Sequence, residues 1–303
     1  MYRYKIYGLI LETEIEFRQL MPTSEIDEQR TVRVIEEDVE EEVITRLTEA
    51  NALECKYTIS FDISAFMNKG GYYLIRNGRE ILFKTKPGYT PETIAVWILG
   101  FSLTMALLQR DTIAMHCSAL LCDKGALMVV GVPGAGKSSV TRVLIESGFR
   151  FLADDVAPIR NVDGTNMVYP AFPYQKLCRN EVEKRNMNLD ELIYISSEKD
   201  KYLVPVKEIF DENPQPLKCI VMLMAARTDK LVVQRIKGFD TYRVVRENVF
   251  LHKLQGAWEG DPRAVNACMK IASEVPVYLI VRPIEKDTLF EIRDEILKIV
   301  DEL

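Results

Sequence analysis

The sequence predicts an α/β protein with a strand-rich amino-terminal lobe followed by a larger α/β domain. Polar and apolar side chains alternate roughly along residues 2–7, as in a half-buried strand. A glycine-rich turn joins an apolar run to a helical pattern within residues 126–147, and an apolar stripe at helical spacing marks residues 289–303. We place the lobe at residues 1–100, ending in a buried helix, and the second domain at residues 101–303.

The composition is that of an ordinary globular protein and argues against several classes of partner. Of 303 residues, 48% are apolar and 28% are charged, with 39 Lys and Arg against 45 Asp and Glu, a net charge of -6. An acidic chain without a basic block is poorly suited to neutralising phosphates, so we expect neither nucleic acid nor a membrane surface as a partner. The longest apolar stretch, residues 94–108, is shorter than the ~20 residues that a membrane-spanning helix requires.

The six cysteines indicate free thiols rather than a zinc site or a disulfide framework. No two of them have C-x-x-C spacing, and the two histidines are far apart in sequence. A chain of this length needs no disulfides to hold its core. The amino terminus lacks the apolar core of a signal peptide, so we expect a cytoplasmic protein.

The lobe is predicted to be built from strands and hairpins. Residues 2–7 form the first strand, and residues 14–17 continue the same alternation. Residues 72–76 and 79–83 are rich in aromatic and β-branched side chains and flank Asn77-Gly78. Because both turn residues tolerate a positive φ, this pattern predicts a β-hairpin with a type I′ turn.

Two further segments complete the lobe. The acidic residues between 36 and 42 have no evident cationic partner in the pattern, and we interpret them as a solvated face rather than a metal site. Thr90-Pro91 is a typical helix start, with Thr90 as N-cap and Pro91 at the first position. The helix is expected to extend to about Arg110 and to be buried, because it is apolar nearly all round.

The second domain alternates buried strands with helices. The helix expected over residues 137–147 has Val140, Val143 and Leu144 on one side and Gly148 as its stop. The last helix presents one apolar face of Leu289, Ile292, Ile296, Ile299, Val300 and Leu303. Strands are expected at residues 118–122, 126–130, 149–153, 219–224 and 275–281.

Residues 131–138 match G-x-x-x-x-G-K-[ST], the pattern of a phosphate-binding loop. The glycines allow the backbone to surround an anion with its N–H groups, and the following helix adds the positive end of its dipole. We expect Lys137 to contact the β- and γ-phosphates of a nucleotide and Ser138 to hold Mg²⁺ through its hydroxyl. The alternative is a glycine-rich turn without a ligand. The expected nucleotide-binding residues are Gly131, Val132, Pro133, Gly134, Ala135, Gly136, Lys137, Ser138 and Ser139.

Two adjacent acids end the strand that follows the loop helix. A carboxylate at Asp154 can reach a magnesium ion on Ser138. Asp155 is a candidate general base, which must lie within hydrogen-bond reach of an attacking hydroxyl. Neighbouring side chains on a strand point to opposite sides, so both acids can contribute only if the strand is already turning. The alternative for Asp155 is a cap of the next turn, and the alternative for His116, just before the 118–122 strand, is a structural role.

In this order and spacing, His116, the loop 131–138 and Ala153-Asp154-Asp155 resemble the catalytic domain of the HPr kinase/phosphorylase family. The resemblance is specific over about residues 112–180. It implies a P-loop-containing fold related to phosphoenolpyruvate carboxykinase and transfer of phosphate from ATP, with Mg²⁺, to a serine of a protein. It also implies that Asp154 holds the metal, Asp155 takes the serine proton and His116 assists near the phosphates.

The chain also departs from that family. The family's second signature, Glu-Val/Ile-Arg-Gly, has no clear equivalent, because residues 169–177 read Tyr-Pro-Ala-Phe-Pro-Tyr-Gln-Lys-Leu. This puts phosphorylase activity, recognition of HPr and the family's hexamer in doubt. The lobe, with Tyr7-Gly8-Leu9, and the segment 201–206 look like those of HPr-kinase-like proteins found beside lasso-peptide biosynthesis genes. Those proteins phosphorylate a serine at the carboxyl terminus of a small precursor peptide.

We therefore expect an ATP- and Mg²⁺-dependent serine kinase that acts on a peptide or small protein. A transferring phosphoryl group needs positive charge beyond one lysine, and Lys176, Arg179 and Arg227 are candidates, each with a surface role as the alternative. Other functions stay open: a kinase for free serine, a nucleotide-binding switch or ATPase without an acceptor, or a scaffold with a vestigial site. The acceptor's identity, its docking place and whether the chain forms a homo-oligomer also stay open.

Overall fold

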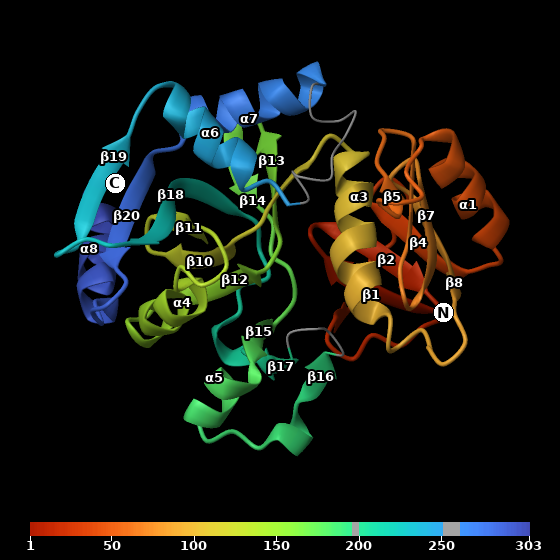
Figure 1. Cartoon of the computed structure of the whole chain (residues 1–303), viewed down its shortest axis with the longest axis horizontal. Coiled ribbons are helices and arrows are strands. Elements are labelled where there is room, and N and C mark those ends of the chain that lie inside the picture. Colours follow the sequence, from red (N-terminus) through yellow and green to blue (C-terminus); the bar gives the residue numbers. More distant parts are fainter. Residues whose placement is uncertain (196–199, 251–260) are drawn as a thin grey trace. The chain divides into compact units, whose positions relative to one another are not determined.

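The computed structural model describes residues 1–195, 200–250 and 261–303, apart from the side chain of Lys184. The chain forms two compact units (Figure 1). The unit boundaries do not follow a single cut in the sequence, because the chain passes between the units more than once. Unit 1 is built mainly from Met1–Ala114 and Cys178–Leu203, and unit 2 from Met115–Leu177, Val204–Phe250 and Asn266–Leu303. The division expected at residue 100 stays a prediction.

Unit 1 contains an eight-stranded sheet in the order β3-β1-β2-β4-β8-β7-β6-β5. The β2–β4 and β4–β8 pairs are parallel, and the other pairs are antiparallel. Its elements are β1 (Tyr2–Ile6), β2 (Leu9–Thr13), β3 (Met21–Pro22), β4 (Thr31–Glu36), α1 (Glu40–Glu49), β5 (Tyr57–Thr58), β6 (Ile63–Met67), β7 (Gly71–Arg76), β8 (Glu80–Thr85), α2 (Ala95–Trp97), a π-helical turn (Ile98–Ser102), α3 (Leu103–Leu108), α5 (Arg179–Lys184), a 3-10 turn (Leu189–Glu191) and β16 (Ile193–Ile195).

The predicted hairpin and buried helix of this unit are confirmed. Asn77 and Gly78 have φ values of 52° and 62°, and the Arg79 N–H donates to the Arg76 carbonyl at 2.9 Å, which closes the turn between β7 and β8. The helical segment begins at Ala95, with Ile94 as its N-cap, so the start predicted at Thr90-Pro91 was wrong. It ends at Leu108 rather than Arg110 and is interrupted by the π-helical turn. Every residue of α3 is buried, as its apolar composition requires.

The strand expected over residues 14–17 was wrong. β2 ends at Thr13, whose hydroxyl accepts the Ile15 N–H at 3.1 Å. The Phe17 N–H donates to the Tyr4 hydroxyl at 3.0 Å, and both of these aromatic side chains are buried. Side-chain oxygens rather than a neighbouring strand therefore satisfy these backbone groups, and apolar alternation alone does not distinguish the two cases.

The acidic residues 36–42 have partners that no sequence pattern indicated. Lys84 of β8 donates to Asp38 at 3.0 Å and to Glu40 at 2.9 Å. These hydrogen bonds lower the pKa of both carboxyls. Glu40 also begins α1, where negative charge is favourable at the positive end of the helix dipole. The acidic side chains are exposed or half-buried, which agrees with the interpretation of a solvated face.

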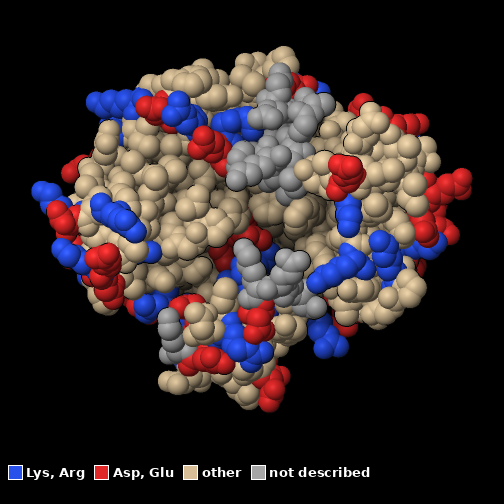
Figure 2. Space-filling model, in the orientation of Figure 1, with Lys and Arg blue, Asp and Glu red and all other residues tan. Residues whose placement is uncertain are grey.

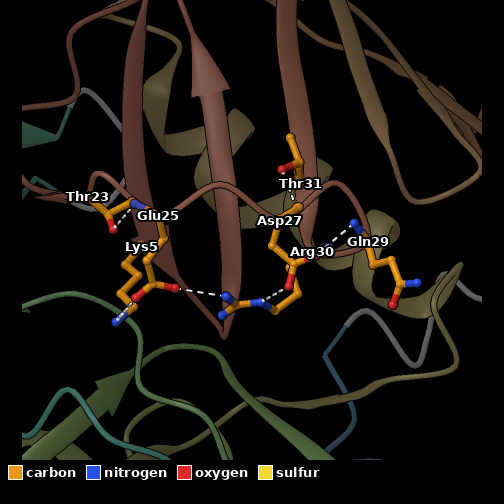
Figure 3. Close-up of polar contacts among 7 residues, drawn as sticks. All are labelled: Lys5, Thr23, Glu25, Asp27, Gln29, Arg30 and Thr31. Atoms are coloured by element: carbon orange, nitrogen blue, oxygen red, sulfur yellow. Dashed lines mark hydrogen bonds and ion pairs between the residues drawn. The ribbon is translucent and has the colours of Figure 1, made fainter.

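Ion pairs hold the segment between β3 and β4 (Figure 3). Arg30 donates to Asp27 at 2.7 Å and to Glu25 at 2.8 Å, and Lys5 lies 2.7 Å from Glu25. The Thr31 hydroxyl donates to the Asp27 carbonyl at 2.7 Å. These side chains are about one third exposed or more, so solvent screens each ion pair and its contribution to stability is small.

Unit 2 contains a second sheet, whose main path runs β12-β10-β11-β18-β14-β13, with β20 pairing β18 and β19. Figure 1 shows α4 and α8 together against one side of this sheet. The elements are β10 (Ser118–Cys122), β11 (Gly125–Val130), α4 (Lys137–Glu146), β12 (Arg150–Asp154), β13 (Ala157–Val162), β14 (Thr165–Val168), a 3-10 turn (Lys207–Ile209), β18 (Gln215–Ala226), β19 (Val232–Ile236), α6 (Phe239–Glu247), β20 (Val277–Pro283) and α8 (Leu289–Asp301). Four further elements contain residues of both units: β9 (Ile113–Met115), β15 (Tyr174–Cys178), β17 (Lys201–Pro205) and α7 (Pro262–Glu274).

The strands and helices predicted for this domain are confirmed, with ends displaced by a few residues. Val140, Val143 and Leu144 of α4 are buried, and Gly148 has the positive φ of a helix stop, 98°. Ile292 and Ile296 of α8 are buried in the same core cluster as Val140 and Leu144. The chain is therefore an α/β protein with strand-rich sheets in both units.

No helix within the described residues is long and apolar enough to cross a membrane. Figure 2 shows basic and acidic side chains interspersed over the face that it presents. The expectation that nucleic acid and membranes are not partners stays a prediction.

Candidate active site

The carboxyl ends of four strands of unit 2 lie at one edge of the sheet. β11, β18 and β20 are mutually parallel, and β12 runs in the same direction because β11 and β12 are both antiparallel to β10. The residues that follow these strand ends therefore gather at this edge. They include the glycine loop after β11, Asp154 and Asp155 at the end of β12, and Arg282 near the end of β20.

Ser118 links the acid pair to the strand that leads into the loop. As the first residue of β10, it pairs with Val129 of β11 on one side and with Asp154 of β12 on the other. Two strand spacings of about 4.8 Å place Asp154 roughly 10 Å from Val129, which is two residues before the loop. The Ser118 hydroxyl donates to Asp154 Oδ1 at 2.8 Å. Sequence reasoning did not single out this serine.

The glycine loop has the backbone that an anion site needs. Gly131 has a φ of 140°, and a Cβ at that position would lie 2.4 Å from the Leu223 carbonyl oxygen of β18. Gly134 and Gly136 also have positive φ, 85° and 106°, and a Cβ at Gly134 would meet no atom within 4 Å. The loop therefore lies against β18 at its start and faces open space at Gly134. Ala135, between Gly134 and Gly136, is buried in the core cluster and anchors this part of the loop.

The residues that close the loop begin α4. Lys137 is the first residue of this helix, and its Nζ donates to the Gly131 carbonyl at 2.5 Å. Ser138 and Ser139 are half-buried in the first helical turn. Val132 and Pro133 are exposed at the tip of the loop. The loop thus ends at a helix amino terminus, where backbone N–H groups and the helix dipole favour an anion.

Asp154 is held in place by hydrogen bonds on both carboxylate oxygens. Oδ1 accepts the Ser118 hydroxyl, and Oδ2 accepts the backbone N–H of Lys176 at 3.1 Å. Burial raises the pKa of this carboxyl, and the charge of Asp155 raises it further. A bound cation would offset both effects, so the residues present fit the magnesium role proposed from the sequence.

Asp155 lies at a turn of the backbone. Its φ is 76°, so the chain leaves the extended conformation immediately after β12. Its Oδ2 lies 2.7 Å from Lys176 Nζ, while the Lys176 N–H reaches Asp154. One residue of β15 therefore contacts both acids. The chain therefore turns at Asp155, as it must if Asp154 and Asp155 are both to contribute to one site.

His116 contacts the same turn. Its Nδ1 lies 2.9 Å from the Asp155 carbonyl oxygen and 3.5 Å from Asp155 Oδ1. Both partners are acceptors, so a proton on Nδ1 serves both contacts, and Nε2 of the neutral ring is then an acceptor. The backbone N–H of His116 donates to the Asn248 carbonyl at 2.7 Å, which fixes the chain at this point.

Cys117, between His116 and Ser118 in sequence, has a buried thiol. Burial raises the pKa of Cys117, and the charges of Asp154, Lys137 and Asp155 also act on it. The thiol itself is inert, because its thiolate form is strongly disfavoured.

The three cations that the sequence suggested as further phosphate contacts have different surroundings in the structure. Lys176 lies beside Asp155 and is only 14% exposed. Arg179 instead pairs with Asp200 at 2.6 Å. Arg227 is exposed just beyond β18. Sequence reasoning missed Arg282, which donates to carbonyls of the glycine loop, because nothing in the local pattern around it indicates so distant a contact.

No protein-family model and no curated protein matches the chain. Among solved structures, it is similar to the Hpr(Ser) kinase/phosphatase from Coxiella burnetii, with a TM-score of 0.33 and 14% sequence identity. That similarity covers 63% of this chain and 99% of the other. A TM-score of this size assigns neither a fold family nor an activity, so the proposal below depends on the residues of this chain.

Proposed function

We propose that the chain is an ATP- and Mg²⁺-dependent serine kinase of the HPr-kinase-like type that phosphorylates a peptide or small protein. The observation that supports it most is the position of Asp155. It follows β12, whose end lies at the same sheet edge as the glycine loop, lies at a left-handed turn and contacts both Lys176 and His116. A nucleotide switch or ATPase without an acceptor needs the loop and Asp154 but has no use for a second acid at this turn.

The loop and the first turn of α4 would bind the phosphates. Backbone N–H groups of the loop provide donors, with no Cβ in the way at its three glycines, and Lys137 provides a positive charge. Ser138 and Asp154 would hold the magnesium ion, which neutralises charge on the phosphate oxygens when bound. Mg²⁺ commonly uses one or two protein oxygens and completes its shell with water and phosphate oxygens.

Asp155 would act on the acceptor. Its carboxylate accepts the proton of the serine hydroxyl while that oxygen forms a bond to the γ-phosphorus, and the bond from that phosphorus to the ADP oxygen breaks. Lys176 holds the Asp155 carboxylate at 2.7 Å and places a second positive charge beside it. His116 fixes the backbone of the turn through the Asp155 carbonyl. These groups supply positioning and charge neutralisation, which account for most of phosphoryl-transfer catalysis.

For the acceptor we propose the carboxyl-terminal serine of a small peptide, as in lasso-peptide precursors. The support is the sequence resemblance to HPr-kinase-like proteins of that kind and the lack of the signature that accompanies HPr recognition. A free serine molecule is the competing acceptor, since it would use the same catalytic groups.

The test is phosphoryl transfer by the purified protein with ATP and Mg²⁺. The acceptors are a peptide ending in serine, the same peptide ending in alanine, and free serine, with products identified by mass spectrometry. We expect transfer to the terminal serine of the first peptide only. Faster turnover of free serine would replace the peptide with a metabolite as substrate, and ATP hydrolysis without transfer to either would overturn the kinase assignment.

Asp155→Asn isolates the proposed base. We expect it to lower transfer by at least about a hundredfold, the usual effect of losing a general base, while calorimetric affinity for ATP is unchanged. Asp163→Asn is the matched control, because Asp163 is an exposed aspartate with the same left-handed backbone, at φ 48°, in the β13–β14 turn. Transfer that survives Asp155→Asn unaltered would show that the mechanism is wrong.

A further inference from the structure

Arg282 connects the glycine loop to a distant strand. It lies near the end of β20, pairs with Ala225 of β18 and is 147 positions beyond Ala135 in the chain. Its Nε donates to the Ala135 carbonyl at 3.0 Å, and its Nη2 donates to the Gly134 carbonyl at 3.2 Å. Nη1 donates to the Pro283 carbonyl of its own strand at 3.2 Å. The planar guanidinium is thus fixed on β20 and holds two consecutive loop carbonyls.

These contacts set the orientation of two peptide groups. In a trans peptide the C=O and the N–H point in opposite directions. The group between Gly134 and Ala135 gives its C=O to Arg282 and its N–H to the Val132 carbonyl at 3.1 Å. The group between Ala135 and Gly136 gives its C=O to Arg282, so the Gly136 N–H points away from the guanidinium.

The glycines on either side make such an anchor necessary. Gly134 and Gly136 have φ values of 85° and 106°, and glycine adopts positive and negative φ almost equally well. Their own conformational preferences therefore do not hold the intervening peptide groups in one orientation. Ala135 is buried and fixes the position of the loop, but its single methyl group does not determine how the adjacent peptide planes are rotated.

We propose that Arg282 is a positioning residue for the phosphate-binding loop. By holding the carbonyls of Gly134 and Ala135, it keeps the following amide groups turned towards the phosphates of the nucleotide. It acts through the backbone rather than by touching the ligand, since its donors face carbonyl oxygens. This inference depends on the proposed nucleotide binding and adds to it a residue that lies outside the loop motif.

The test compares Arg282→Met and Arg282→Lys with the matched control Arg142→Met. Arg142 is on α4, the helix that follows the glycine loop, and it pairs with Glu146 at 2.8 Å rather than with the loop carbonyls. Calorimetry with Mg²⁺ measures affinity for ATP and for inorganic tripolyphosphate, which has the phosphates but no base. Thermal melting followed by circular dichroism shows whether each variant is folded.

We expect Arg282→Met to weaken both ligands at least about tenfold, as loss of a charge-assisted hydrogen bond does. Equal effects on the two ligands indicate that the phosphate contacts are affected and the base contacts are not. Arg282→Lys should recover part of the affinity, because lysine keeps the charge but lacks the planar pair of donors. Arg142→Met should bind like the wild type.

Wild-type affinity in a folded Arg282→Met protein would overturn the inference and leave the proposed function standing. An equal loss in Arg142→Met would overturn it too, because the effect would then not be specific to the loop carbonyls. If Arg282→Met does not fold, wild-type affinity in Arg282→Lys gives the same refutation. A wild-type protein that binds neither ATP nor tripolyphosphate would overturn the proposed function, and this inference with it.

Discussion

Replacement of Gly131 by alanine is the most severe test of how the glycine loop fits against β18. The residue has a φ of 140°, and a Cβ there would lie 2.4 Å from the Leu223 carbonyl oxygen. That oxygen belongs to a strand hydrogen-bonded to β11 on one side and β20 on the other, so it cannot move away easily. Gly134 has a φ of 85°, but a Cβ there would meet nothing within 4 Å.

Gly131→Ala and Gly134→Ala both place a Cβ on a residue with positive φ. They differ in the clash with the Leu223 carbonyl oxygen, which only Gly131→Ala produces. A left-handed conformation costs a residue with a Cβ about 1–2 kcal/mol, and this is the whole expected loss in the free energy of unfolding for Gly134→Ala. Gly131→Ala adds the overpacking of a buried position, which typically costs about 1–3 kcal/mol, so we expect a loss of about 2–5 kcal/mol. Gly148→Ala, at φ 98° with open space around it, should behave like Gly134→Ala although it lies outside the loop.

Urea unfolding followed by circular dichroism measures these free energies. Because the chain forms two compact units, hydrogen exchange of peptides from β11 and β18 is needed to follow unit 2 separately. The expected result is faster exchange and an earlier transition in Gly131→Ala than in the two other variants. Equal destabilisation of all three would refute the close approach of the loop to Leu223.

Three further predictions concern charge and hydrogen bonding. Burial raises the pKa of Asp154 above its usual 3.8, so the folded protein holds this proton more tightly than the unfolded chain does. The free energy of unfolding should therefore fall as pH rises from 3.8 through the raised pKa. Urea titrations at several pH values should show this fall in the wild type and not in Asp154→Asn. Lys176→Met should lower kcat at least about tenfold in the transfer assay, whereas Arg179→Met, whose guanidinium is engaged elsewhere, should not; equal effects would contradict the site. Tyr4→Phe should cost about 1–3 kcal/mol in urea unfolding, because the buried Phe17 N–H loses its acceptor; an unchanged midpoint would contradict that contact.

Local patterns predicted the elements whose cause is local. The turn at Asn77-Gly78 follows from the tolerance of both residues for positive φ, and the structure has that turn. The strand, glycine loop and helix around residues 126–147 were likewise predictable, because apolar runs and a glycine stop determine them within one short segment. The alternation that suggested a strand at residues 14–17 was misleading, since hydroxyl groups of Thr13 and Tyr4 compete for the backbone there.

Contacts between distant segments were not predictable from one sequence. Lys176 and Arg179 are equivalent cations three positions apart, and only the fold places the first beside Asp155 and pairs the second with another acid. Arg282 reaches the loop because β18 and β20 are parallel neighbours, a relation that no local pattern contains. Lys84 finds the acidic residues near α1 for the same reason.

The central claim is that the glycine loop and the two acids beside it transfer a phosphoryl group to a serine. The most direct measurement is mass spectrometry of a serine-ending peptide after incubation with the purified protein, ATP and Mg²⁺. The account predicts one added phosphoryl group on the terminal serine with the wild-type protein and none with Asp155→Asn. An unmodified peptide in the presence of bound ATP, or equal modification by both proteins, would contradict it.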